Sequence, residues 1–75
     1  MTNQVVRLNY PSTLLRVPII NQLIKQYDLT VNIMRAEIDN EKGWIEIQLA
    51  GNIQTIEDAI EWLRLQGVNV EFIQD

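Results

Sequence analysis

The chain contains neither cysteine nor histidine. Without cysteine no disulfide can form, and without either residue the usual ligand sets of zinc and iron sites are missing. The same absences exclude Cys-His and Ser-His-Asp nucleophile arrangements, so catalysis would have to rest on carboxylates, lysine or tyrosine alone. We therefore expect no catalytic residues, no metal and no cofactor, and we expect that the protein is not an enzyme.

Long apolar runs are also missing, and positive charge is scarce. Nowhere does an apolar segment approach the roughly 20 residues that a membrane-spanning helix needs, and the N-terminus has no apolar segment before a cleavage site. Six Lys and Arg against ten Asp and Glu give a net charge of −4, which repels nucleic-acid phosphates and anionic membrane surfaces. We expect a cytoplasmic protein with no nucleic-acid partner and no membrane insertion.

The chain is short, with 75 residues of which 47% are hydrophobic. So small a domain buries a smaller share of its surface than a large one, which leaves its stability marginal unless something adds to the core. With no cross-links, self-association is the addition that fits best, because a subunit interface buries further apolar area. We expect a homodimer.

Apolar residues alternate in four segments and recur at helical spacing in two others. The helical spacing predicts one helix over residues 18–27, where Pro18 suits the first position, and a second helix that ends at Gln66. The alternation predicts strands over residues 5–10, 31–39, 44–49 and 68–73.

Turn and cap signals mark the ends of these elements. Thr55 and Asp58 resemble a capping pair at the start of the second helix, and Gly67 fits the left-handed residue that closes it. Residues 40–43 are expected to form the turn between the second and third strands, with Gly43 able to take positive φ.

The order strand, helix, strand, strand, helix, strand predicts an α+β fold, the ferredoxin-like βαββαβ sandwich. In this fold a four-stranded antiparallel sheet carries both helices on one face. The right-handed crossover rule places the first and third strands in the middle of the sheet. The second strand, over residues 31–39, is then an edge strand beside the third.

The sheet face opposite the helices must meet water or a partner. Four large apolar residues are expected on this otherwise polar face, and water is a poor neighbour for them: Val31, Ile33, Trp44 and Ile73. One interpretation is that these are scattered exposed hydrophobic residues. The other is that the edge strand pairs with its copy in a second subunit, since bare edges invite pairing. On the second interpretation the interface comprises Val31, Ile33, Arg35 and Trp44.

Residues 31–51 read Val-Asn-Ile-Met-Arg-Ala-Glu-Ile and, after a short charged turn, Gly-Trp-Ile-Glu-Ile-Gln-Leu-Ala-Gly. This hairpin resembles the signature of the NIL domain family, named for an Asn-Ile-Leu run that stands here as Asn32, Ile33 and Met34. The resemblance extends over nearly the whole chain and implies a single domain over residues 4–74. The best understood members of the family are C-terminal domains of bacterial methionine importer ATPase subunits, which bind methionine and switch the transporter off.

The resemblance implies a ligand site at the start of the second strand. In the importers the Asn of the motif takes part in methionine binding, and Asn32 is the matching position, with Ile33 and Met34 expected to flank the side chain of the ligand. A primary amide can meet both the carboxylate and the ammonium of an amino acid. The alternatives are that Asn32 ties down backbone NH groups at the strand start and that Met34 is a core residue.

Two differences from the importer domain bear on function. The hairpin turn is compressed, and the chain holds no ATPase to regulate; because it begins at Met, we expect a complete product rather than a fragment of an importer. Other relatives are joined to iron-sulfur modules, but a chain without cysteine holds no such cluster. Two functions remain: a stand-alone regulatory domain that binds methionine or a related amino acid at a homodimer interface, or a ligand-free interaction module that docks on a transporter or metabolic enzyme.

Overall fold

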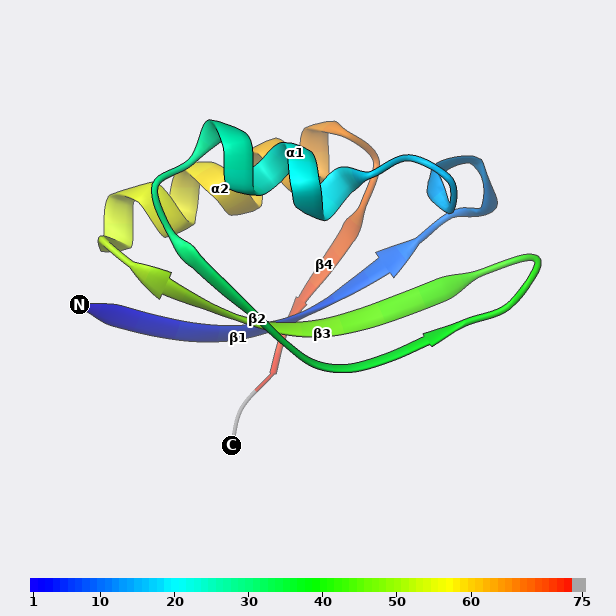
Figure 1. The fold of residues 1–75 in the computed structure, drawn as a ribbon, viewed down its shortest axis with the longest axis horizontal. Coiled ribbons are helices and arrows are strands. Elements are labelled where there is room, and N and C mark those ends of the chain that lie inside the picture. The colour runs from blue at the N-terminus through cyan, green and yellow to red at the C-terminus, as the bar shows by residue number, and fades with distance from the viewer. Residues whose placement is uncertain (74–75) are drawn as a thin grey trace.

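The computed structural model describes residues 1–73. The strands are ordered β2-β3-β1-β4, and every neighbouring pair is antiparallel. Both helices cover one face of the sheet (Figure 1), which confirms the predicted α+β sandwich with β2 on an edge. The elements along the chain are β1 (Thr2–Tyr10), a 3-10 turn η1 (Ser12–Leu14), α1 (Ile19–Gln26), β2 (Thr30–Ile38), β3 (Gly43–Gly51), α2 (Ile53–Leu65) and β4 (Asn69–Phe72).

The observed elements lie close to the predicted ones, with differences at their ends. β1 begins at Thr2 rather than at residue 5, and α1 begins directly after Pro18, which lies one position outside the helix. Neither helix in residues 1–73 has both the length and the apolarity needed to span a bilayer. The predicted domain boundary at Gln74 lies outside the described residues.

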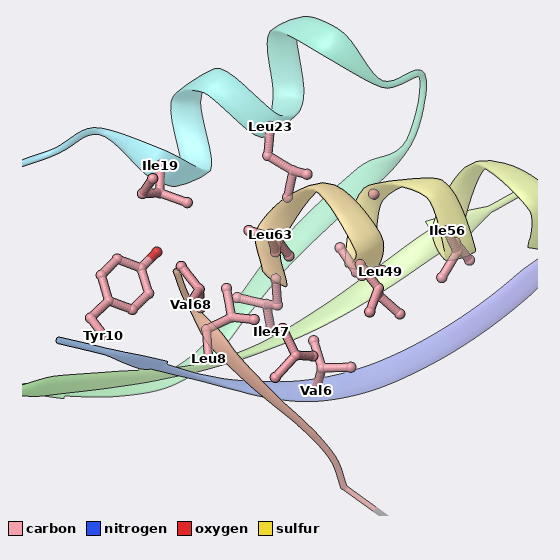
Figure 2. Close-up of a cluster of buried hydrophobic side chains, with 13 residues drawn as sticks. Val6, Leu8, Tyr10, Ile19, Leu23, Ile47, Leu49, Ile56, Leu63 and Val68 are labelled. Carbon is pink, nitrogen blue, oxygen red and sulfur yellow. The ribbon is translucent and has the colours of Figure 1, made fainter. Parts of the chain in front are cut away.

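The core lies between the sheet and the two helices (Figure 2). On β1 and β3 every second side chain points at the helices, and Val6, Leu8, Ile47 and Leu49 have no exposed surface. Six buried residues of the helices pack against these strand residues. Four of them recur along α2 at helical spacing, and two lie on α1: Ile56, Ala59, Ile60 and Leu63 on α2, and Ile19 and Leu23 on α1. Burial of these aliphatic side chains is the main hydrophobic contribution to the free energy of folding.

The ends of α2 show one prediction confirmed and one wrong. Gly67 takes φ of 101°, and the backbone NH groups of Gly67 and Val68 donate to the carbonyls of Arg64 and Leu63, as in a Schellman motif. The predicted capping pair of Thr55 and Asp58 is wrong, because the helix begins two residues before Thr55. The cap is instead Asn52, whose side-chain oxygen accepts from the Gln54 backbone NH at 2.8 Å.

The turn between β2 and β3 is formed by residues 39–42, not by residues 40–43. The Asp39 carboxylate accepts from the backbone NH groups of Glu41 at 2.8 Å and Lys42 at 2.9 Å, and these bonds hold the pKa of Asp39 below its usual range. Because this side chain closes the turn, Gly43 needs no positive φ and instead pairs with Ile38 inside the ladder. A Cβ at Gly43 would lie 3.0 Å from the Ile38 and Leu15 side chains, so glycine permits their close approach.

The cap of α2 provides a test of this assignment. Replacing Asn52 by Ala removes the acceptor for the Gln54 NH and is expected to lower the free energy of unfolding by about 1 kcal/mol. The control is Thr55→Ala, which leaves the cap intact and is expected to cost less than about 0.5 kcal/mol. Urea unfolding followed by circular dichroism measures both. A larger loss for Thr55→Ala than for Asn52→Ala would contradict the observed helix start.

Candidate functional site

The two edges of the sheet differ in length. β4 has 4 residues, whereas β2 has 9 and, among the strands of residues 1–73, is hydrogen-bonded only to β3. Every β2 residue except the half-buried Val31 is exposed. A long edge strand with one side unpaired is a ready template for another strand. β2 is therefore the part of the sheet most open to a partner.

A β-bulge at Met34 changes which side chains of β2 face the helices. Ile33 lies opposite Ile47 and Arg35 lies opposite Glu46, so Met34 has no partner on β3. The extra residue shifts the alternation by one position. The prediction that Val31 and Ile33 lie on the open face is therefore wrong: both face the helix side, where Val31 packs against the core. Beyond the bulge, the predicted orientation is correct.

The sequence does contain a signal for this bulge. Apolar residues fall at 31 and 33 and then at 34, 36 and 38, so the apolar phase changes between Ile33 and Met34. The result is an apolar edge in which three side chains are more than half exposed, namely Ile33 (58%), Met34 (53%) and Ile38 (59%). Met34 is thus an exposed residue rather than the core residue of the alternative interpretation.

Asn32 lies on the open face of β2, opposite Gln48 of β3. Its side chain is exposed and makes no hydrogen bond within residues 1–73. The alternative in which the amide ties down backbone NH groups at the strand start is therefore not what the structure shows. Both donors and the acceptor oxygen of the Asn32 amide are available to a ligand.

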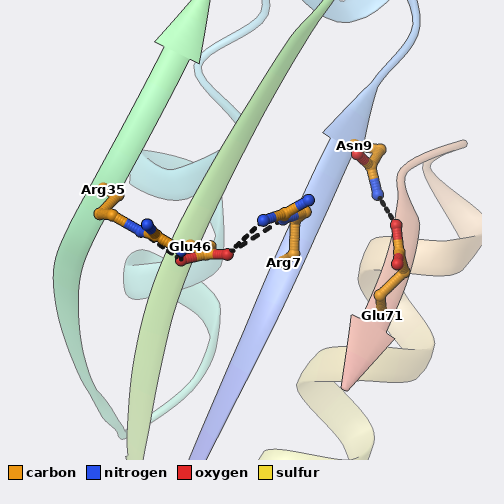
Figure 3. Close-up of polar contacts among 5 residues, drawn as sticks. All are labelled: Arg7, Asn9, Arg35, Glu46 and Glu71. Atoms are coloured by element: carbon orange, nitrogen blue, oxygen red, sulfur yellow. Dashed lines mark hydrogen bonds and ion pairs between the residues drawn. The ribbon is translucent and has the colours of Figure 1, made fainter. Parts of the chain in front are cut away.

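Glu46 lies on the central strand β3 and forms ion pairs with two arginines across the open face (Figure 3). The residue is 5% exposed, and its carboxylate lies between two arginines from the flanking strands. Arg7 Nη2 lies 2.6 Å from Oε2, and Arg35 Nη2 lies 2.7 Å from Oε1. The hydrogen bonds from Arg7 and then Arg35 hold the pKa of Glu46 below its usual range. Sequence reasoning missed this cluster, although its three charged residues share one predicted sheet face.

The same two arginines cover Trp44. The Arg7 guanidinium carbon lies 4.5 Å from the Trp44 ring centroid, and that of Arg35 lies 5.9 Å away. Each guanidinium is attracted to the electron-rich face of the half-buried Trp44 ring by a cation–π interaction. Of the predicted site residues, the structure brings together Arg35 and Trp44, while Asn32 lies further along the open face and Ile33 lies on the opposite side of the strand.

The Glu46 cluster predicts a pH dependence of stability. Because the folded-state pKa is lowered, the stabilisation is fully present above the unfolded-state value of roughly 4.3 and is lost as the pH falls through the folded-state value. Urea unfolding between about pH 7 and pH 3 is expected to show a smaller loss of stability for Glu46→Gln than for the unmodified chain. Glu41→Gln, in the exposed turn, should retain the full loss. Equal pH profiles for all three proteins would contradict the assignment.

Comparison with known proteins identifies relatives along the whole chain. The family model of the NIL domain matches residues 4–72. The methionine import ATP-binding protein MetN 2 of Acinetobacter baylyi is 36% identical over 72 residues, which cover 91% of this chain and 21% of that protein. An uncharacterized protein of Synechocystis is 29% identical over 76 residues, which cover 99% of this chain and 78% of that protein.

Solved structures give the same result. The crystal structure of the C-terminal domain of an ABC transporter ATP-binding protein from Enterococcus faecalis matches with a TM-score of 0.84 and 33% identity, over 96% of this chain and 84% of that one. The de novo designed protein Foldit4, with a TM-score of 0.58 and 12% identity, shares the fold alone. The chain spans about a fifth of the length of the importer ATPases that it matches. It belongs to the NIL domain family.

Proposed function

We propose that this chain is a regulatory domain that binds methionine or a related amino acid where two copies meet along β2. Its relatives are domains of proteins named for methionine import, and NIL is a regulatory rather than a catalytic domain. The observation that carries the proposal is the free amide of Asn32 on a long, exposed edge strand. Regulation of an importer ATPase or a metabolic enzyme would take place in the cytoplasm, which is the location that we propose for this chain.

The chemistry of β2 suits a free amino acid. The Asn32 oxygen can accept from an α-ammonium group while its NH₂ donates to the α-carboxylate. Met34, the exposed residue at the bulge, adds an apolar, polarizable contact for a thioether side chain. Ile33 faces the helix side of the strand, away from Asn32, and would contribute at the dimer interface rather than beside the amide. One strand surrounds a ligand on one side only, whereas binding sites usually bury most of a small ligand. A second copy of β2 would supply the missing wall.

Pairing of β2 with its copy would also give hydrogen-bond partners to the unpaired backbone groups along the free edge. In a two-fold dimer the same strand meets itself, so its unpaired NH and carbonyl groups gain partners on both subunits. The exposed side chains of Ile33, Met34 and Ile38 would become buried. Among the residues first expected at the interface, Ile33 and Arg35 lie on β2 itself. Val31 already packs against its own core, and Trp44 lies one strand further in.

The alternative function is a ligand-free interaction module. The same exposed edge favours it, because an extended segment of a transporter or metabolic enzyme can add to a free strand by β-augmentation. The two functions differ in what completes β2. A regulatory domain pairs with its copy and binds an amino acid, whereas a module without ligand leaves β2 open for a different protein.

Calorimetric titration tests the ligand. The unmodified chain is expected to release or absorb heat with methionine or a related amino acid such as homocysteine, and Asn32→Ala is expected to weaken binding about tenfold or more by removing the amide contacts. Asn40→Ala, in the exposed turn, is the matched control and should bind normally. The absence of both heat and a thermal shift across an amino-acid panel would remove the ligand from the proposal.

Sedimentation equilibrium tests the dimer. Ile33→Asp places a charge on the free edge of β2 and is expected to convert the dimer to a monomer. Because the residue is already exposed, the monomer is expected to keep its fold by circular dichroism, with a melting temperature that no longer rises with protein concentration. Ile53→Asp is the control, since Ile53 is similarly exposed (52%) at the start of α2. A monomeric unmodified chain, or an Ile33→Asp dimer as tight as the original, would favour the interaction module instead.

A further inference from the structure

A shallow hollow of about 300 Å³ lies on the helical layer, where the end of α1 meets α2. Most of its lining is apolar, and two carboxylates stand among the lining residues. It is lined by Tyr27, Asp58, Glu61, Trp62 and Leu65. None of these residues belongs to β2 or to the Glu46 cluster, so the hollow is a separate feature of the surface.

The α2 side chains that line the hollow form a second stripe along the helix, beside the stripe of its core residues. Asp58, Glu61, Trp62 and Leu65 are spaced by three, one and three residues, which places them on one helix face. Tyr27, directly after α1, meets Trp62 edge to face, with ring centroids 6.3 Å apart and an interplanar angle of 61°. The two rings form the apolar part of the hollow, and Leu65, 74% exposed, extends it outward.

The carboxylates of the hollow have no cationic partner within residues 1–73. The ion pairs in this part of the chain both involve Glu46. From the described part of the chain, Asp58 accepts one side-chain hydrogen bond, which comes from Gln54, and Glu61 accepts none. Two further exposed acids, Asp28 and Glu57, adjoin lining residues in the chain. The base Arg64 also adjoins Leu65, but its guanidinium lies over the Phe72 ring and donates to the Val70 carbonyl rather than to the carboxylates of the hollow. The hollow is therefore negative and aromatic at once.

This combination matches a cationic side chain. Aromatic faces attract guanidinium and ammonium groups, and a carboxylate accepts two parallel hydrogen bonds from a guanidinium. We propose that the hollow receives an arginine side chain from a basic segment of a partner protein. The chain's net charge of −4 attracts such a segment. The proposal is independent of amino-acid binding at β2.

The shape of the hollow favours a partner protein over a free small cation. Its volume lies at the bottom of the range for small-molecule sites, which are roughly 300 to 1,000 Å³ and enclose most of their ligand. A free cation there would keep much of its contact with water. An arginine on a partner chain gains further contact area from its neighbours, and the exposed Leu65 supplies apolar surface for them to cover.

Titration with the blocked peptide acetyl-Gly-Arg-Arg-Gly-amide, followed by ¹H–¹⁵N NMR, tests the proposal. The Trp62 indole NH and the Glu61 and Leu65 amides are expected to shift in a saturable way, while the Trp44 indole NH stays in place. The double variant Asp58→Asn/Glu61→Gln is expected to bind about tenfold more weakly, because the guanidinium loses its charged acceptors. Both residues are exposed, and the amide introduced at position 58 keeps an oxygen acceptor for Gln54, so the helix is expected to remain intact by circular dichroism.

The matched control is Glu37→Gln/Glu41→Gln on the β2–β3 hairpin, which changes the net charge by the same amount and should preserve binding. Three results would overturn the proposal. The first is the absence of a Trp62 shift, and the second is equal weakening by the control pair, which would mean that net charge alone attracts the peptide. The third is saturable binding of tetramethylammonium as tight as that of the peptide, which would mean that the hollow takes a small free cation.

Discussion

The nine-residue pairing of β1 with β3 determines how the rest of the molecule is arranged. It places two fully buried ladders of aliphatic side chains under the helices, and it leaves β2 and β4 as the two edges. β4 is too short to offer much free backbone, whereas β2 is long and exposed. The sheet therefore has one long, exposed edge, and the proposed function places a partner at this edge.

The polar face of the sheet shows why that partner is expected at the edge. Glu46 pairs with both Arg7 and Arg35 across three strands, and the two guanidinium groups cover Trp44. A face satisfied in this way is stable in water without a second layer. Of the large apolar side chains on the strands that are more than half exposed, three lie along β2, namely Ile33, Met34 and Ile38, and one, Phe72, lies on the short edge strand β4.

The element order and the core could be predicted from the sequence because they depend on periodicity, which α2 and β1 follow without interruption. Two of the predictions that were wrong concern places where a single side chain accepts hydrogen bonds from backbone NH groups. Asp39 closes the hairpin turn, so Gly43 does not need a positive φ. Asn52, and not Thr55, is the N-cap of α2. The orientation of Val31 and Ile33 failed because strict alternation was assumed through a bulge. Asn32 was found from a family motif, whereas the Glu46 cluster required strand register, which no local pattern supplies.

Amide hydrogen exchange along β2 tests the central claim most directly, because it measures whether the free edge acquires a partner. At concentrations where the dimer forms, the β2 amides that do not donate to β3 are expected to become protected, and dilution is expected to restore their fast exchange. Fast exchange of these amides at every concentration, with and without methionine, would contradict the account.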